Sequence, residues 1–191
     1  IKSGKLYSWG QNSEGELGQN NTVKYSSPVQ IPGTTWDSNA GGGGAKNFGT
    51  NAAFIKTDNT LWVWGENDYG ALGLNQSPSG PQYSSPIQLP GSWSACRLGR
   101  TSVLATKTDG TLWAWGQNFK GQFGQNNQTN YSSPIQIGSS TDWKTDKDSI
   151  GTGAQNMAAI NTDGELWICG HCEQGQLGQN SPTNSHRSSP V

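Results

Sequence analysis

Charged side chains are scarce in this chain. Only 13% of its 191 residues are Asp, Glu, Lys or Arg, and the formal net charge is -1. Nucleic acids and anionic membranes are normally held by a cationic surface, so the composition gives no electrostatic basis for binding nucleic acid or a membrane. No apolar run approaches the roughly 20 residues that span a bilayer, and we predict no membrane insertion.

Residues typical of helical proteins are also in the minority. Asn, Gln, Ser and Thr account for 70 residues and Gly for another 27, which excludes a coiled coil or bundle built from Ala, Glu, Lys and Leu. Nine tryptophans argue against disorder, because disordered segments are poor in aromatic residues. The chain starts at Ile1 without a charged-then-apolar signal stretch, so we expect an excerpt or a processed product.

One stretch rich in glycine and tryptophan occurs four times. The copies read GKLYSWGQNSEGELGQN from Gly4, NTLWVWGENDYGALGLN from Asn59, GTLWAWGQNFKGQFGQN from Gly110 and GELWICGHCEQGQLGQN from Gly164. Each copy is followed by Ser-Ser-Pro, which ends at Pro28, Pro86, Pro134 and Pro190. A period near fifty residues is typical of a repeat protein built from similar structural units.

Each unit reads as short strands joined by a tight turn. Apolar runs flank Asp58-Asn59, Asp109-Gly110 and Asp163-Gly164. We predict a hairpin with a primed turn at these positions, because Asp-Gly tolerates positive φ and the primed turn matches the twist of the strands. The Ser-Ser-Pro segment predicts an outer strand with proline at its start, where the missing N–H matters least.

The ordered string of Asp, Gly, Leu, Trp, Gly, Asn, Gly, Leu and Gly resembles the regulator of chromosome condensation repeat family. The resemblance covers nearly the whole chain, and the low charge and near-identical units look like a bacterial or bacteriophage version. It implies an all-β fold, a β-propeller with blades of four antiparallel strands in a seven-bladed ring. A WD-type propeller is the nearest alternative, with shorter repeats and a different signature.

The chain is too short for seven units. It holds about three and a half units at this period, which we place near 1–50, 51–102, 103–156 and 157–191 of a partial β-propeller over residues 1–191. Propellers avoid exposed strand edges by radial repetition. We therefore expect either the remaining blades of the same ring or self-association with another copy.

Two motifs invite a catalytic interpretation. Cys169-Gly170-His171-Cys172 has the spacing of thiol–disulfide oxidoreductases, but that chemistry needs the first Cys at a helix N-terminus. Here Cys169 stands at the Trp position of the repeat and Cys172 at the Asn position. The three aspartates recur at one turn position, whereas a catalytic pair needs carboxylates in different environments.

Metal binding is also disfavoured, because a zinc site needs four good ligands and Cys96 and His186 lie far from this pair along the chain. We predict a protein that is not an enzyme and that has no cofactor and no metal. The state of the three cysteines stays open between free thiols and an incidental disulfide.

The segments before each Ser-Ser-Pro vary most in length and letters. We expect them to project as a ring of loops, where function usually resides on such scaffolds. Our candidate binding residues are Tyr25, Tyr83, Tyr131 and Arg187. The alternative is that each Tyr packs against the neighbouring blade. Because charge is sparse, a neutral protein surface or a glycan is favoured over nucleic acid as the partner.

The sequence therefore predicts a non-enzymatic binding or structural module. Its composition favours an extracellular or virion surface over the cytoplasm. The alternative is a nucleotide-exchange factor for a small GTPase, because some members of the family act in this way through a wedge inserted from one face. No unit of this chain carries a long, charged insertion that would suit such a wedge.

Overall fold

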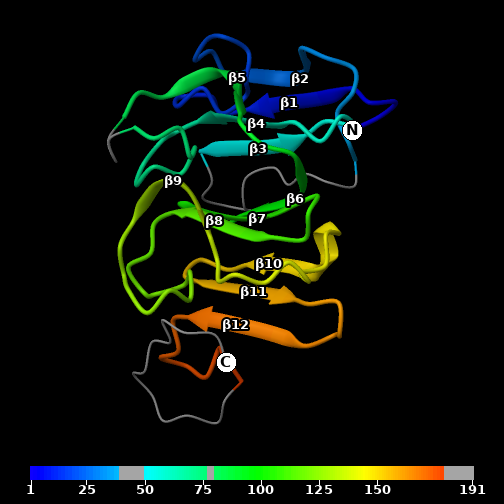
Figure 1. Cartoon of the computed structure of the whole chain (residues 1–191). Helices are drawn as coiled ribbons and strands as arrows, with labels where there is room; N and C mark the ends of the chain where they lie inside the picture. The colour runs from blue at the N-terminus through cyan, green and yellow to red at the C-terminus, as the bar shows by residue number, and fades with distance from the viewer. Residues whose placement is uncertain (39–49, 77–79, 179–191) are drawn as a thin grey trace.

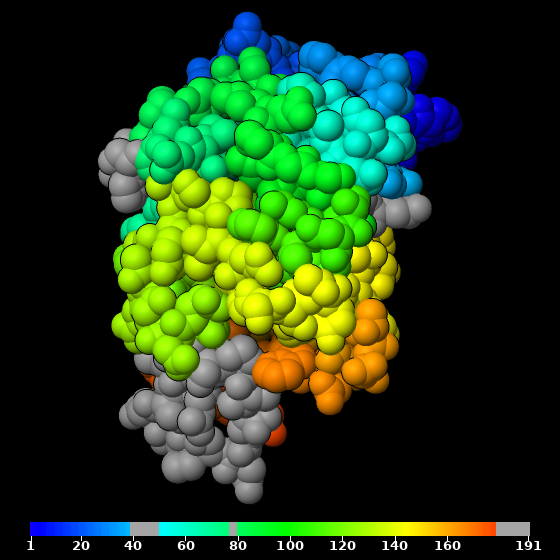
Figure 2. Space-filling model, viewed as in Figure 1, coloured from blue at the N-terminus to red at the C-terminus, as the bar shows by residue number. Residues whose placement is uncertain are grey.

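Four antiparallel β-sheets make up this structure, a computed structural model that describes residues 1–38, 50–76 and 80–178. The sheets are stacked in chain order (Figure 1), and the surfaces of successive sheets form consecutive colour bands (Figure 2). Within these residues the single helical element is the 3-10 turn Lys147–Ser149. No helix of the described segments has the length and apolarity needed to cross a membrane.

The third sheet contains four strands and is a complete blade. The bounds of the strands in the four sheets are β1 (Leu6–Gly10) and β2 (Tyr25–Ile31); β3 (Asn51–Ile55), β4 (Leu61–Gly65) and β5 (Tyr83–Leu89); β6 (Trp93–Leu98), β7 (Ser102–Lys107), β8 (Leu112–Gly116) and β9 (Tyr131–Gln136); β10 (Ile150–Thr152), β11 (Asn156–Ile160) and β12 (Leu166–Gly170). The predicted all-β propeller blades of antiparallel strands are confirmed. Because β6 lies in the sequence unit 51–102, a blade starts one strand earlier than the sequence repeat.

The hairpin turns differ in type from the prediction. Only the second turn residue has a positive φ, as in Asn59 at 64° and Gly110 at 79°, whereas a primed turn of type I′ needs two. The amide of Asn59 donates to the carbonyl of Lys56 at 2.9 Å. These features define a three-residue loop in which a type I turn is followed by one left-handed residue. The turn therefore starts at the Thr before each Asp.

The prolines of the outer strands lie inside those strands rather than at their starts. Pro86 is the fourth residue of β5. The pairing of β4 with β5 shifts between Val63, opposite Ile87, and Gly65, opposite Tyr83. The segment around Pro86 therefore bulges away from the ladder, and proline is tolerated because this strand does not need its N–H for pairing.

Adjacent blades are joined by a buried tryptophan. The indole Nε1 of Trp64 donates to the carbonyl of Glu16 in the first blade, and that of Trp115 donates to Ala71 in the second blade, each at 2.9 Å. Both side chains are almost fully buried. A Cβ at Gly73 would lie 2.9 Å from the Trp115 ring nitrogen, so the Gly-x-Leu-Gly segment of one blade forms the seat for the tryptophan of the next.

The same segment also contacts the outer strand of the next blade. A Cβ at Gly70 would lie 2.4 Å from the Cα of Ser132 in β9. This distance is shorter than the contacts that Cβ atoms make with backbone atoms in proteins. Gly70 also has a φ of 76°, a left-handed conformation that L-residues other than glycine adopt at a cost. Both facts require glycine at this position.

We expect Gly70→Ala to lower the free energy of unfolding by about 3 kcal/mol, through overpacking against β9 together with left-handed strain. Gly164→Ala is the matched control, because Gly164 has a φ of 86° and its Cβ would meet nothing within 4 Å. The control is expected to lose about 1 kcal/mol. Urea unfolding followed by tryptophan fluorescence measures both. Equal losses would show that the contact with Ser132 does not constrain the blade interface.

Candidate functional site

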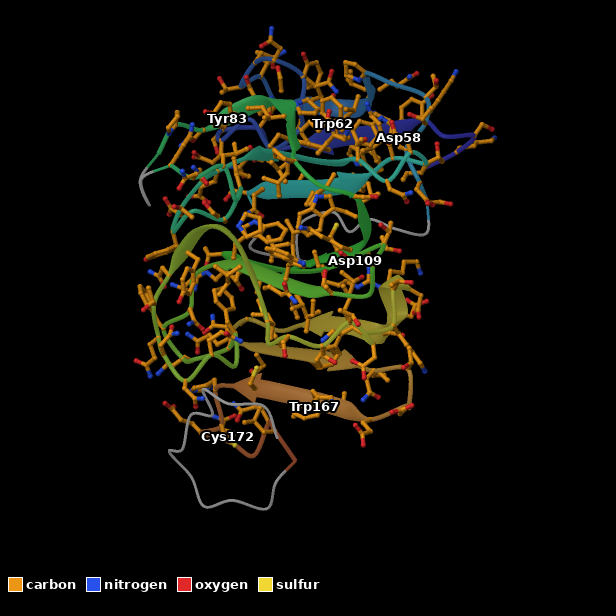
Figure 3. All side chains as sticks on the ribbon, viewed as in Figure 1. Asp58, Trp62, Tyr83, Asp109, Trp167 and Cys172 are labelled. Atoms are coloured by element: carbon orange, nitrogen blue, oxygen red, sulfur yellow. The ribbon has the colours of Figure 1, made fainter. Side chains whose placement is uncertain are left out.

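The ends of the strands define two surfaces on opposite sides of the sheets. One side carries the hairpin turns 57–59, 108–110 and 162–164, which we name the turn rim. The other carries residues 19–24, 74–76, 80–82 and 125–130, which we name the loop rim. In β4, Leu61 lies next to the turn and Gly65 pairs with Tyr83 at the far end. Asp58 and Tyr83 accordingly lie on opposite sides in Figure 3.

The three candidate tyrosines lie at the start of the outer strands, where the loop rim ends. Each is half-buried and pairs with the glycine that ends the tryptophan strand. Each hydroxyl accepts a hydrogen bond from an amide side chain of its own loop. The pairs are Tyr25 with Asn21 at 3.1 Å, Tyr83 with Gln76 at 2.5 Å and Tyr131 with Asn127 at 3.3 Å.

The tyrosine rings also pack against the core. Tyr83 contacts the apolar cluster shared by the second and third blades, and the ring of Tyr131 lies 6.2 Å from that of Phe123. The tyrosines occupy equivalent positions in three successive blades and are not gathered into one cluster. Arg187, the fourth candidate, lies outside the described residues. The tyrosines therefore stabilise the loop rim through their hydroxyl groups and rings, and only part of each side chain is exposed.

The loop rim is pinned to the next blade by an asparagine that the sequence analysis did not single out. The amide of Asn20 donates to the carbonyl of Ser84 at 2.6 Å, and Ser85 Oγ donates to Asn20 Oδ1 at 3.1 Å. Asn75 makes the same two bonds, to Ser132 and from Ser133. In the sequence, this residue is the asparagine that stands two positions after the Leu-Gly or Phe-Gly pair of each copy.

The motif asparagines hold the same loops from inside. Asn12 is buried, and its Oδ1 accepts from the amide of Leu17 at 2.9 Å, while its Nδ2 donates to the carbonyl of Asn21 at 2.8 Å. Asn118 repeats this arrangement in the third blade. Buried polar groups must be satisfied, so these residues serve the loop and are not available to a ligand.

The three cysteines are buried and form no disulfide. Burial raises the pKa of Cys169 to about 12, so its thiol stays protonated near neutral pH. Its Sγ donates to the carbonyl of Gln122 at 2.9 Å, the bond that the indole makes in the other blades. A cavity of about 30 Å³ lies beside it, lined partly by Phe123 and Met157. Among the described residues, no group of three His, Cys, Asp or Glu side chains could hold a metal.

On the turn rim, Asp58 and Asp109 each accept hydrogen bonds within their own turns. Asp58 Oδ1 accepts from the hydroxyl of Thr60 at 2.6 Å and from its amide at 3.1 Å. The side-chain bond comes first among the causes that lower the pKa of Asp58, and the backbone bond follows. Trp62 Nε1 in turn donates to the Thr60 hydroxyl at 2.9 Å. The aspartate therefore orients the tryptophan through the threonine, as Asp109 does in the third blade.

A lysine lies over the tryptophan rings of the turn rim. Lys56 Nζ lies 3.9 Å from the ring centroid of Trp62 and 5.0 Å from that of Trp36. Lys107 Nζ lies 3.6 Å from the centroid of Trp113 and 5.1 Å from that of Trp93. Neither contact was predicted from the sequence, although Lys-Thr-Asp followed by Leu-Trp occurs twice. These are cation–π contacts at two equivalent corners.

Glu66 has a pKa near neutrality. Burial raises the pKa of Glu66 to about 7, and the neighbouring charge of Asp68, followed by those of Glu14 and Glu16, adds to the shift. Its carboxylate accepts a hydrogen bond from the hydroxyl of Thr50. The equivalent residue in the third blade is Gln117, which accepts from Thr101 at 2.9 Å. A neutral acceptor is therefore the normal occupant of this position.

We expect Glu66→Gln to raise the free energy of unfolding by about 1 kcal/mol above pH 7, after allowance for solvent screening. Because the pKa of Glu66 is higher in the folded state, its stabilising contribution is complete below pH 4.5 and is lost as the pH rises to about 7. Chemical unfolding between pH 4 and pH 8 measures the difference, and pH 4 is the internal control where both proteins are expected to match. A constant difference across this range would contradict the assignment.

The comparisons with known proteins identify the same repeat family. The model of the regulator of chromosome condensation (RCC1) repeat matches residues 3–38, 58–105 and 109–154. The chain is 26% identical over 185 residues to human E3 ubiquitin-protein ligase HERC2, covering 92% of this chain and 4% of that protein. It is 34% identical over 134 residues to the zebrafish Protein RCC2 homolog, covering 66% of this chain and 26% of that protein.

Solved structures show the same fold. Human WBSCR16 is similar with a TM-score of 0.79 at 20% identity over 100% of this chain and 48% of the other. Yeast RCC1 (Prp20), solved bound to Kap60, is similar with a TM-score of 0.78 at 18% identity over 98% of this chain and 44% of the other. The chain thus spans less than half of each of these proteins. It belongs to the regulator of chromosome condensation (RCC1) repeat family.

Proposed function

We propose that this chain is a non-enzymatic recognition module that binds a protein surface through its loop rim. The observation that carries the proposal is the double pinning of the loops. Asn20 and Asn75 tie the loops of the first two blades to the next blade, while Asn12 and Asn118 hold the loops of the first and third blades from inside. Loops fixed before binding lose little conformational entropy when a partner docks, which favours a recognition role.

A protein is the favoured partner. The net charge is -1, which gives no electrostatic basis for binding a polyanion such as nucleic acid. Yeast Prp20p binds Gsp1p and histones. A second structure of that protein matches this chain with a TM-score of 0.78 at 18% identity. That relative supports a protein partner for this chain, and a glycan is the alternative ligand. An extracellular or virion-surface location is supported by composition alone, whereas the relatives named above are eukaryotic.

Nucleotide exchange on a small GTPase is the second candidate function. It is favoured by the likeness to the yeast protein described by its binding to Gsp1p. The two functions differ in one observable, because an exchange factor accelerates release of bound nucleotide and a simple binding module does not.

The decisive experiment is a binding panel on the immobilised chain, with a small GTPase, core histones, duplex DNA and a glycan array. We expect binding to a protein, weakened at least about tenfold when two exposed tips of the loop rim are changed together as Val23→Glu and Thr129→Glu. Thermal melting should stay unchanged, since Val23 is 59% exposed and Thr129 is exposed.

Tyr83→Phe is the matched control, because it removes only the hydroxyl that Gln76 contacts and should bind like the parent chain. Tyr83→Ala should lower the melting temperature, since its ring packs on the core. Binding only to a glycan or to DNA would contradict the proposal. Accelerated release of labelled GDP from the GTPase would establish the second candidate instead.

We further propose that the first blade accepts the seat of another blade. Trp9 occupies the position of Trp64 and Trp115 yet is 59% exposed. In the fourth blade, a Cβ at Gly175 or Gly178 would meet no atom of the described residues within 4 Å, whereas one at Gly15, Gly18, Gly70 or Gly73 would contact the next blade. The two surfaces are complementary, and the partner is a further blade of the same polypeptide or a second copy.

We expect the chain on its own to associate with increasing concentration, and Trp9→Ser to weaken this association at least about tenfold by removing the buried anchor. Light scattering over a concentration series measures the mass. Val23→Ser is the control, since Val23 has the same 59% exposure but lies on the loop rim. A parent chain that stays monomeric throughout the series would contradict this proposal.

A further inference from the structure

Three successive blades share one corner on the turn rim. In each, a tryptophan pairs with the residue that precedes the turn, and a second tryptophan follows the turn. Trp36 with Lys56 and Trp143 with Asn161 form isolated β-bridges, and Trp93 pairs with Lys107 at the start of β6. The corner of the fourth blade therefore has asparagine where the second and third blades have lysine.

The two tryptophan rings keep the same geometry in all three corners. Their centroids are 6.5, 6.2 and 6.1 Å apart, with interplanar angles of 75°, 77° and 76°. In the second and third blades a lysine ammonium lies over these rings, 3.9 and 3.6 Å from the nearer centroid. The chain thus shows twice that this pair of rings accommodates an alkylammonium group.

In the second and third blades the lysine side chain passes close to a glycine of the preceding loop. A Cβ at Gly33 would lie 3.8 Å from Lys56 Cε, and one at Gly91 would lie 3.4 Å from Lys107 Cε. In the fourth blade Asn161 replaces this lysine, and Ser139 stands at the sequence position of Gly33 and Gly91. The pocket at this corner has a volume of about 380 Å³ and is lined by Gly138 and both tryptophans, among others. Trp167, which is labelled in Figure 3, is 39% exposed. One of the two tryptophans of the pocket is therefore accessible to a ligand.

The electrostatics of this corner also suit a cation. Asp142, Asp163 and Glu165 line the pocket. The second and third blades have a hydroxyl residue in place of both Asp142 and Glu165. Asn161 is engaged with Glu165, since its Nδ2 donates to Glu165 Oε2 at 2.8 Å, and it brings no positive charge. The described residues that line the pocket include no lysine or arginine.

We propose that the pocket between Trp143 and Trp167 binds the ammonium group of a lysine side chain presented by a partner protein. That lysine takes the place that Lys56 and Lys107 hold in their own blades, over the ring faces, and its charge is balanced by the carboxylates of the pocket. The proposal rests on the protein-recognition function but assigns it a site centred on the turn rim, which borders the loop rim only at Gln125.

The test uses the indole N–H signals of the full chain in NMR, titrated with N-acetyl-lysine methylamide. We expect saturable shifts of the Trp143 and Trp167 signals in the millimolar range, as suits one weakly held side chain. The same probe acetylated on its ε-amino group carries no charge and should not shift these signals. This readout needs no partner protein, so it succeeds or fails independently of the loop-rim experiment.

Asn161→Lys is the decisive variant, because it gives the fourth blade the internal lysine of its neighbours. It should fold at least as well as the parent and bind the probe at least about tenfold more weakly. Lys107→Asn is the reciprocal variant and should create a new response at Trp93 and Trp113. Glu165→Thr restores the hydroxyl found in the other blades and should weaken binding through lost charge while leaving the ring pair intact.

Three results would overturn the proposal. The first is the absence of a saturable shift at up to about 50 mM probe, which is weaker than any useful contact. The second is equal binding by Asn161→Lys or an equal response to the acetylated probe. The third is binding of free putrescine more than about tenfold tighter than a lysine-containing peptide, which would identify a diamine site instead.

Discussion

The bond from an indole Nε1 to a carbonyl of the preceding blade is the contact on which the rest of this structure depends. Trp64 and Trp115 each bury a large ring and satisfy its one polar atom in the same step. A ring of that size fits only because glycines such as Gly73 carry no side chain where it lies. The glycine-rich motif and the tryptophan motif are therefore two halves of one interface, although about fifty residues separate the partners.

The fourth blade shows what changes when this contact changes. Cys169 replaces the tryptophan and its thiol takes over the bond to the preceding blade, but a smaller side chain fills less space and leaves a cavity beside Met157. The same blade replaces lysine by Asn161 at the turn rim. The fourth blade therefore departs from the second and third blades both at its interface and at its turn-rim corner.

The division of the surface into two rims follows from the antiparallel sheets. The Asp-containing hairpin turns gather at one end of the strands, whereas the longer loops lie at the other end together with the β6–β7 and β10–β11 turns. Each rim therefore repeats similar chemistry in the second and third blades. On the loop rim, amide side chains pin the backbone and the tyrosine rings pack inward. On the turn rim, aspartate and threonine orient a tryptophan whose face holds a lysine. A partner that contacts several blades therefore meets equivalent groups at regular intervals, which allows weak contacts to add.

The sequence by itself determined the repeat, the strand positions and the all-β class, because the pattern of glycine, tryptophan and Ser-Ser-Pro is local and returns in register. It also located the tyrosines at the ends of the loops. It did not determine the turn type, since Asp-Gly is compatible with both primed and three-residue loops. Nor did it determine the offset between repeat and blade, because that depends on which strands pair. The seat of Trp64, the pinning by Asn20 and the lysine over Trp62 join residues that are distant in sequence or lie on separate strands. Only the tertiary structure decided these, since their distances depend on how one blade stacks on the next.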